Sequence, residues 1–354
     1  MHAIQVVEPT LEGYSGHCHA LVSSFVQAAA PATIDLWSGK GSADLAFRSG
    51  VTIHPFFRRR IRLPQAFYLF RRLLRQPGRI VVTTARRTDL MLLHLGAAGR
   101  VPPDRVFLYF HWLRATPSRL RFLRSMAVRQ PELVIIGTTE SVVDVFRRCG
   151  FAQVLPLPYP APPSAGTAST VPFRQVLYAG AARQDKGFKA VVDLVALLAA
   201  RNESIPIAVQ ISADHYGKYD AATREDIARL TALRYAPLTL IDETPTPEDY
   251  AARFPGSICL QPYDRSEFRD RVSGVTLDAL AHACPVIASE GTWTADLIGP
   301  FDAGVVLAEP DAESLYAAIK TIRGSYARYQ AGALRAGHAR DRDSWRPLLD
   351  RLTR

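Results

Sequence analysis

Two segments in the second half of the 354-residue chain combine cations, carboxylates and glycines in a way that suits a phosphorylated ligand. The first precedes an apolar stretch with helical spacing, and the amides and positive dipole at the start of a helix attract anions. Its residues of interest are Asp270, Arg271, Ser273, Gly274 and Asp278. We expect the amides of Ser273 and Gly274 to bind phosphate and Asp278 to bind a ribose diol. A capped amphipathic helix with solvated charges is the alternative interpretation.

The second segment, from Tyr178 to Phe188, places two cations between a predicted strand and a predicted helix. Arg183 and Lys186 stand three residues apart, after a turn at Gly180. Positive groups held in a dry site stabilise negative charge on a bound ligand. The segment is not a Walker A loop, in which lysine follows glycine and precedes serine or threonine. We therefore expect Arg183 and Lys186 to bind an anionic group; a solvated strand–helix turn is the alternative interpretation.

Short apolar runs alternate with amphipathic stretches along the whole chain and predict the elements that position these segments. The first half predicts strands at 3–7, 33–37, 79–83, 105–110, 133–137 and 153–155, with helices at 17–29, 65–74, 89–95, 118–127 and 141–148. The second half predicts strands at 175–179, 207–211, 238–241, 257–260, 286–288 and 304–307, with helices at 188–200, 220–233, 247–254, 274–283, 293–298 and 311–323. Such alternation is typical of βαβ units and parallel sheets.

A proline-rich stretch divides this pattern into two domains. We predict a Rossmann-like domain at 1–160, a linker at 161–172 and a second Rossmann-like domain at 173–330. Residues 331–354 are expected to form a helical tail that packs back on the first domain. With 48% hydrophobic residues, the chain can bury two cores. Folds of this kind bind ligands at the carboxyl ends of their strands.

The acidic pair at 270 and 278, followed by Ala-Leu-Ala and by Pro-Val-Ile-Ala, resembles the retaining GT-B glycosyltransferases of family 4. Their motif is Glu-x7-Glu, then Ala-hydrophobic-Ala and Gly-x-Pro-Val, and the 178–188 segment resembles their Gly-Arg…Lys-Gly segment. This chain has aspartate at both acidic positions and Ala283-Cys284 in place of the usual glycine. The resemblance implies an α/β fold with GT-B architecture, in which two Rossmann-like domains face each other across a deep cleft. It also implies that the domain at 1–160 binds the acceptor and that the domain at 173–330 binds the nucleotide sugar.

The resemblance also implies roles for single residues. Arg183 and Lys186 would hold the donor diphosphate, Asp270 would contact sugar hydroxyls, and His111 would lie near the reacting carbon. These four are the predicted catalytic residues. The predicted donor-binding residues are Gly16, Gly180, Arg183, Lys186, Thr244, Tyr263, Arg271, Ser273, Gly274 and Asp278.

No metal site or bound cofactor is predicted. The four cysteines are far apart, and the D-x-D at 341–343 reads as a solvated helix start. A nicotinamide cofactor would need G-x-G-x-x-G after the first strand, and the sequence there does not supply it. The nucleotide sugar would be a substrate, and the cationic segment favours metal-independent chemistry.

The positive charge is concentrated in the first half. Residues 1–160 hold 21 Lys and Arg against 9 Asp and Glu, whereas residues 161–354 hold 22 against 24. Arginines alternate with aromatic and aliphatic residues over 58–75, which favours attachment to an anionic bilayer over ordinary surface charge. Nucleic acid is not expected as a partner, because no recognition module is present. The start of the chain reads as a strand without the layout of a signal peptide, so we expect a cytoplasmic protein, peripheral on the inner face of the membrane.

The predicted function is transfer of a hexosyl group from a nucleotide-diphosphate sugar to a saccharide or lipid-linked saccharide acceptor, in polysaccharide or glycoconjugate synthesis. The resemblance implies retention of anomeric configuration. Two alternatives remain open. One is another GT-B enzyme, an inverting transferase or a sugar-nucleotide epimerase, and the other is a catalytically silent GT-B-like binding subunit.

Overall fold

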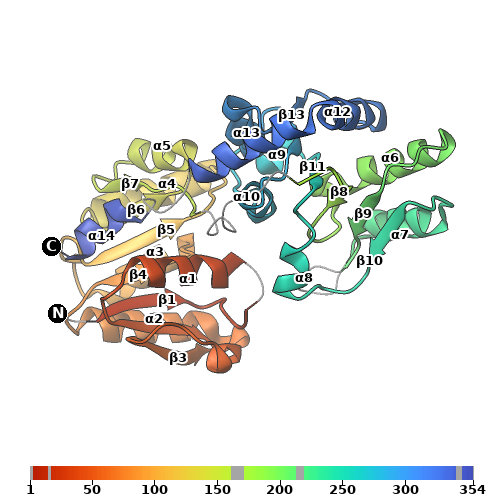
Figure 1. The fold of residues 1–354 in the computed structure, drawn as a ribbon. Coiled ribbons are helices and arrows are strands. Elements are labelled where there is room, and N and C mark those ends of the chain that lie inside the picture. Colours follow the sequence, from red (N-terminus) through yellow and green to blue (C-terminus); the bar gives the residue numbers. More distant parts are fainter. Residues whose placement is uncertain (1–2, 15–16, 161–170, 213–218, 340–344, 354) are drawn as a thin grey trace. The chain divides into compact units, whose positions relative to one another are not determined.

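The computed structural model describes residues 3–14, 17–160, 171–212, 219–339 and 345–353 (Figure 1). The chain divides into two compact units, which we call unit 1 (Met1–Pro160 and Arg342–Arg354) and unit 2 (Ala161–Asp341). Most of the predicted linker, residues 161–170, lies outside the described residues. Among the described helices, none is long and apolar enough to cross a membrane.

Unit 1 is built on a seven-stranded parallel sheet in the order β3-β2-β1-β4-β5-β6-β7. The strands are β1 (Ile4–Glu8), β2 (Ile34–Gly39), β3 (Val51–Phe57), β4 (Ile80–Val82), β5 (Val106–Phe110), β6 (Val134–Gly137) and β7 (Val154–Pro156). The helices are α1 (His17–Ala28), α2 (Arg62–Leu74), α3 (Arg87–Gly96), α4 (Pro117–Arg129), α5 (Glu140–Arg148) and α14 (Arg346–Thr353), with 3-10 turns η1 (Lys40–Asp44) and η2 (Arg59–Ile61).

Strand β3 is absent from the sequence prediction. It carries Pro55 in its interior, and proline is a signal against a strand because it has no amide hydrogen to donate. Among the strands that the structure describes, β3 forms one edge of the sheet and pairs only with β2. An edge strand leaves one side of its backbone unpaired, so it accommodates the proline.

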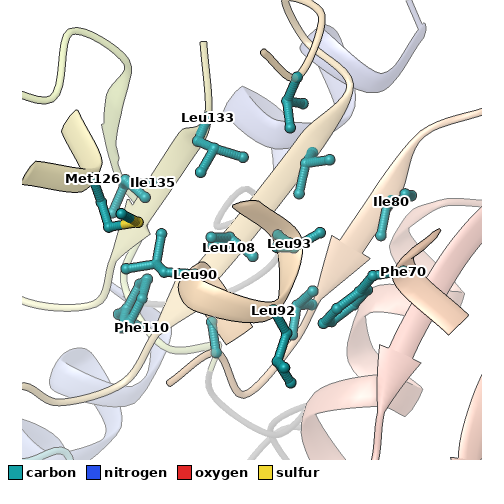
Figure 2. Packing of buried hydrophobic residues seen from close by; sticks show 14 of the residues in the cluster. Phe70, Ile80, Leu90, Leu92, Leu93, Leu108, Phe110, Met126, Leu133 and Ile135 are labelled. Carbon is teal, nitrogen blue, oxygen red and sulfur yellow. The ribbon is translucent and has the colours of Figure 1, made fainter. Parts of the chain in front are cut away.

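The core of unit 1 lies between the sheet and a layer formed by α2, α3, α4 and α5. Figure 2 shows Leu90 and Leu93 of α3 among side chains of β5, which include Leu108 and Phe110. All four side chains are 1% exposed or less. Burying each of them stabilises the fold by about 1.5–3 kcal/mol. This packing holds the carboxyl ends of the strands in place.

Unit 2 is built on a six-stranded parallel sheet in the order β10-β9-β8-β11-β12-β13. The strands are β8 (Gln175–Tyr178), β9 (Ile207–Gln210), β10 (Leu238–Ile241), β11 (Ser257–Gln261), β12 (Val286–Ser289) and β13 (Gly304–Leu307). The helices are α6 (Phe188–Ala200), α7 (Ala221–Ala232), α8 (Pro247–Ala251), α9 (Arg265–Phe268), α10 (Gly274–Ala281), α11 (Trp293–Ile298), α12 (Ala312–Gly324) and α13 (Tyr326–His338), with 3-10 turns η3 (Gln184–Lys186) and η4 (Gly299–Phe301).

The direction of strand order in unit 2 reverses between β8 and β11. From β8 the chain first adds β9 and β10 on one side, and it then returns to place β11, β12 and β13 on the other. The loops that leave β8 and β11 therefore begin side by side at the same edge of the sheet. In doubly wound sheets this reversal is where ligands bind.

The C-terminal part of the chain belongs to both units. Helix α13 packs against α10 in unit 2, and α14 belongs to unit 1 although it ends the chain. Trp345, just before α14, donates a hydrogen bond from its indole nitrogen to Ser24 Oγ at 2.9 Å. Arg351 donates to Gln153 Oε1 at 3.0 Å, and Figure 1 shows α14 near β6 and β7. Pro347 lies in the first turn of α14, where proline is tolerated.

Candidate functional site

The site in unit 2 is formed by the two loops that leave β8 and β11. After β8 the chain turns at Gly180 with φ +90° and enters η3, which is followed by Gly187 with φ +68°. A side chain at Gly187 would place its Cβ 1.9 Å from the Pro262 carbonyl oxygen, so only glycine fits there. The backbone N–H of Asp264 donates to the carbonyl oxygen of Asp185 at 3.0 Å. Together these contacts hold η3 against the loop that follows β11.

The Lys186 amine lies next to the first turn of α10. A Cβ built on Gly180 would lie 3.0 Å from Lys186 Nζ and 3.4 Å from Cγ2 of Val275, so both groups border the same side of this turn. Burial of the amine lowers its pKa from 10.5 to about 8. The nearby Arg183 guanidinium acts in the same direction, and the carboxylate of Asp185 partly opposes both. Keeping Lys186 protonated in the folded protein therefore costs free energy, and a bound anion would reduce that cost.

Two guanidinium groups meet on one carboxylate beside Lys186. Arg183 donates from Nε to Asp185 Oδ1 at 2.8 Å, and its Nη2 pairs with Oδ2. Arg271 Nη1 lies 3.6 Å from the same Oδ2. The Arg271 guanidinium also lies over the Phe268 ring, 4.8 Å from its centroid. Burial and the proximity of Arg183 lower the pKa of Arg271, as expected where cations are gathered for an anion.

The start of α10 is open. Ser273 caps the helix, and its side chain accepts a hydrogen bond from the Thr276 amide. A Cβ at Gly274 would have no atom within 4 Å, so the backbone there is accessible to a ligand. Below this turn, the Thr276 hydroxyl donates to Gln261 Oε1 at 2.5 Å and lies 3.0 Å from the Thr294 hydroxyl. This buried network fixes the first turn of α10 on the end of β11.

One turn into α10, Asp278 is paired with a tyrosine. Tyr250, on α8, donates from its hydroxyl to Asp278 Oδ2 at 3.2 Å. Burial raises the pKa of Asp278 from 3.8 to about 6, and the hydrogen bond from Tyr250 limits the rise. Within the described part of the chain, the other carboxylate oxygen, Oδ1, accepts no hydrogen bond. Asp278 can therefore bind hydroxyl groups as a carboxylate at neutral pH.

The structure brings together most, but not all, of the predicted residues of unit 2. Gly180, Arg183, Lys186 and Arg271 form one cluster, with Ser273 and Gly274 at the adjoining start of α10. Asp270 is half-buried next to Arg271 in sequence. Thr244 is exposed and follows the edge strand β10, two strands away from β8. Tyr263 is buried, with its ring 4.4 Å from that of Phe268.

The predicted residues of unit 1 are His111 and Gly16. Gly16 lies outside the described residues. His111 follows β5, and its Nε2 donates to the Thr83 carbonyl oxygen at 2.7 Å, because a carbonyl can only accept. The imidazole also contacts the rings of Tyr109 and Tyr159 edge to face. The role of His111 near a reacting carbon stays a prediction.

The sequence interpretation missed three groups. Asp185 carried a local signal, since it stands between Arg183 and Lys186. Tyr250 carried none, because it lies 28 residues before its partner Asp278. In unit 1, Glu8 at the end of β1 is fully buried and accepts hydrogen bonds from the hydroxyls of Thr10, Thr83 and Thr84.

No group of three or more His, Cys, Asp or Glu side chains within the described part of the chain is placed to hold a metal ion. The D-x-D at 341–343, which we interpreted as a solvated helix start, lies outside that part.

Comparisons with known proteins identify the fold. No protein-family model matches the chain. No curated protein sequence matches it either. Among solved structures, the chain is similar to the sucrose-phosphate synthase of Thermosynechococcus elongatus, with a TM-score of 0.71, 15% identity, and coverage of 99% of this chain and 98% of the other. It is similar to a trehalose-6-phosphate synthase studied for glycosyl transfer with retention (TM-score 0.70, 13% identity, 99% of both chains).

A third similar structure is HepE of Anabaena in complex with UDP-glucose, with a TM-score of 0.67, 13% identity, and coverage of 99% of this chain and 98% of the other. These matches span both units of the chain. They confirm the predicted fold class: two parallel-sheet α/β domains of the GT-B type.

Proposed function

We propose that this chain is a glycosyltransferase that binds a nucleotide-diphosphate sugar through the cluster of cations in unit 2. The observation that carries the proposal is the meeting of Lys186, Arg183 and Arg271 beside the open start of α10, at the strand reversal of the sheet. The complex of HepE with UDP-glucose supports the class of donor. Asp278 would hold the ribose, and Asp270 the hydroxyl groups of the donor sugar.

In this proposal, the protein accelerates transfer by stabilising the leaving diphosphate. Negative charge accumulates on the diphosphate as the glycosidic bond breaks, and fixed cations in a partly dry site stabilise that charge without reorganisation. The leaving phosphate itself takes the proton of the acceptor, so no protein nucleophile is required and no metal is needed. Retention of configuration is the expected outcome, and the trehalose-6-phosphate synthase comparison supports it.

The proposal is tested by thermal denaturation of the purified protein with a panel of nucleotide sugars. We expect one donor, and its nucleoside diphosphate, to raise the melting temperature, since ligand at a hundred times its dissociation constant stabilises by about 2.7 kcal/mol. Product analysis by NMR then shows whether the anomer is retained. Binding without hydrolysis or transfer would instead indicate a silent binding subunit, and no binding at all would refute the proposal.

The Asp278→Ala variant separates ribose recognition from phosphate recognition. We expect about tenfold weaker binding of the nucleoside diphosphate, because one charge-assisted hydrogen bond is lost. The binding of inorganic pyrophosphate should be unchanged. For the wild type, nucleoside diphosphate affinity should fall relative to pyrophosphate below about pH 6, because Asp278 then becomes protonated. An equal loss of affinity for both ligands would show that Asp278 acts at the phosphates or only stabilises the fold.

We further propose that unit 1 attaches to an anionic membrane and thereby reaches a lipid-linked acceptor. Helix α2 buries Ala66, Leu69, Phe70 and Leu73 against the sheet. On its outer side and on η2, Leu63 and Tyr68 are exposed by 53% and 60%, and Ile61 by 46%. Exposed arginines precede and follow these residues in the sequence, among them Arg58, Arg59, Arg60, Arg72 and Arg75. An apolar surface within a basic field suits the interface of an anionic bilayer.

Sedimentation with lipid vesicles tests this attachment. We expect binding to vesicles that contain phosphatidylglycerol and none to pure phosphatidylcholine, with a decrease as salt rises. The double variant Arg59→Glu/Arg60→Glu should lower the affinity at least tenfold, at about 1 kcal/mol per arginine. Arg234→Glu, an exposed arginine of unit 2, is the matched control. Equal vesicle binding by wild type and double variant would refute this surface.

A further inference from the structure

Asp185 occupies the groups that are expected to bind the diphosphate. Both nitrogens of one edge of the Arg183 guanidinium pair with its two carboxylate oxygens, and Arg271 lies 3.6 Å from one of them. Both arginines therefore pair with the same carboxylate. One carboxylate thus neutralises part of a three-cation cluster.

The position of this carboxylate is set by the backbone. Asp185 is the central residue of η3, which is closed by the Lys186 amide donating to Arg183 O and by the Gly187 amide donating to Gln184 O. Its own carbonyl oxygen accepts from the Asp264 amide. The side chain is 21% exposed, so it is neither fully solvated nor sealed in the core. It can leave the arginines by rotating about its side-chain bonds while the backbone stays in place.

A carboxylate and a phosphate compete for the same arginine geometry. The guanidinium presents a planar pair of N–H groups that matches two oxygens of either anion. When Asp185 uses this edge of Arg183, a phosphate cannot use it at the same time. Any ligand that takes the edge must displace the carboxylate, and the energy of the existing pair is subtracted from the binding energy.

We propose that Asp185 is an internal competitor for the diphosphate and that it promotes release of the nucleoside diphosphate product. This inference rests on the proposed function. The three cations and Asp185 together carry two net positive charges when Lys186 is protonated. That charge balances the pyrophosphate diester of a nucleotide sugar, whereas the released nucleoside diphosphate carries a further negative charge once its terminal phosphate ionises near pH 6. Asp185 therefore disfavours the product more than the donor.

The test is calorimetric titration of inorganic pyrophosphate into wild type and Asp185→Asn. Asparagine keeps the size of the side chain and removes its charge, so we expect about tenfold tighter binding, which is about 1.4 kcal/mol. The titration is done at pH 6.5, because the loss of Asp185 lowers the pKa of Lys186 further and its proton must be retained. With the nucleotide identified by the donor panel, the product-inhibition constant should fall more than KM.

Matched variants keep the result interpretable. Asp185→Glu keeps the charge. Its affinity for pyrophosphate should lie within about threefold of that of the wild type, a smaller change than the tenfold effect expected for Asp185→Asn. Asp193→Asn removes a carboxylate on α6 that pairs with Lys189 and Arg229, outside the cluster, and should change nothing. Asp185→Ser serves as a second neutral variant if Asp185→Asn does not fold.

Weaker or unchanged pyrophosphate binding by the neutral variants would overturn the inference, because Asp185 would then orient Arg183 instead of competing for it. The proposed function fails differently. If wild type and Lys186→Ala bind pyrophosphate equally, the cation cluster is not a diphosphate site. If only Lys186→Ala loses binding and Asp185→Asn matches wild type, the function stands and the competitor role does not.

Discussion

Replacement of Lys186 by alanine is expected to slow sugar transfer by a factor of about one hundred or more. Loss of one preorganised group that stabilises developing negative charge typically costs 10²–10³-fold, or about 2.7–4 kcal/mol. Lys186 is placed for this role because its amine lies beside Gly180 and the first turn of α10. Initial rates at saturating donor measure the effect. The loss should appear in kcat, since the diphosphate charge grows in the transition state.

Lys189→Ala is the matched control. Lys189 lies on the same helix-turn segment, and its amine pairs with Asp193 on the exposed face of α6. It should retain the wild-type rate. If the transfer rate of Lys186→Ala falls by less than about tenfold, equivalent to ~1.4 kcal/mol of barrier, Lys186 does not stabilise the leaving group.

The second large effect is a gain: removal of the charge at Lys186 should make the folded protein more stable. The Lys186→Met variant should raise the free energy of unfolding by about 3 kcal/mol at pH 7, because a pKa displaced from 10.5 to about 8 measures the cost of holding the charge in the folded state. Methionine fills a similar volume without the charge. A site prepared for an anion is thus destabilising while it is empty, and the same variant is expected to be inactive.

Urea unfolding at several pH values measures this gain. Between pH 8 and 10.5 the unfolded chain holds a proton on Lys186 that the folded protein has lost, so wild-type stability rises with pH in this window. The advantage of Lys186→Met should be largest below pH 8 and should disappear near pH 10.5. Lys189→Met, at an exposed position, controls for the substitution. A pH-independent gain would mean that packing, and not charge, is the cause.

Both experiments concern Lys186, which the local sequence already indicated as a site residue. The alternation of strands and helices could also be predicted from the sequence. Every strand predicted in the two halves is present, and the predicted fold class is confirmed. Such patterns are readable because hydrophobic periodicity depends on neighbours a few residues apart. β3 was missed because Pro55 is compatible with a strand only at an edge, and strand order is not a local property.

The sequence by itself therefore determined the βαβ alternation, the cationic turn after Gly180 and the glycine-opened helix at Ser273. The tertiary structure alone decided that Asp185 pairs with Arg271, that Tyr250 meets Asp278, and that burial lowers the pKa of Lys186. These contacts join segments that are apart in the chain, and Asp185 reaches Arg271 because β8 and β11 are neighbours in the sheet. Residue spacing shows which groups are present, whereas strand order and burial decide which of them touch and at what charge.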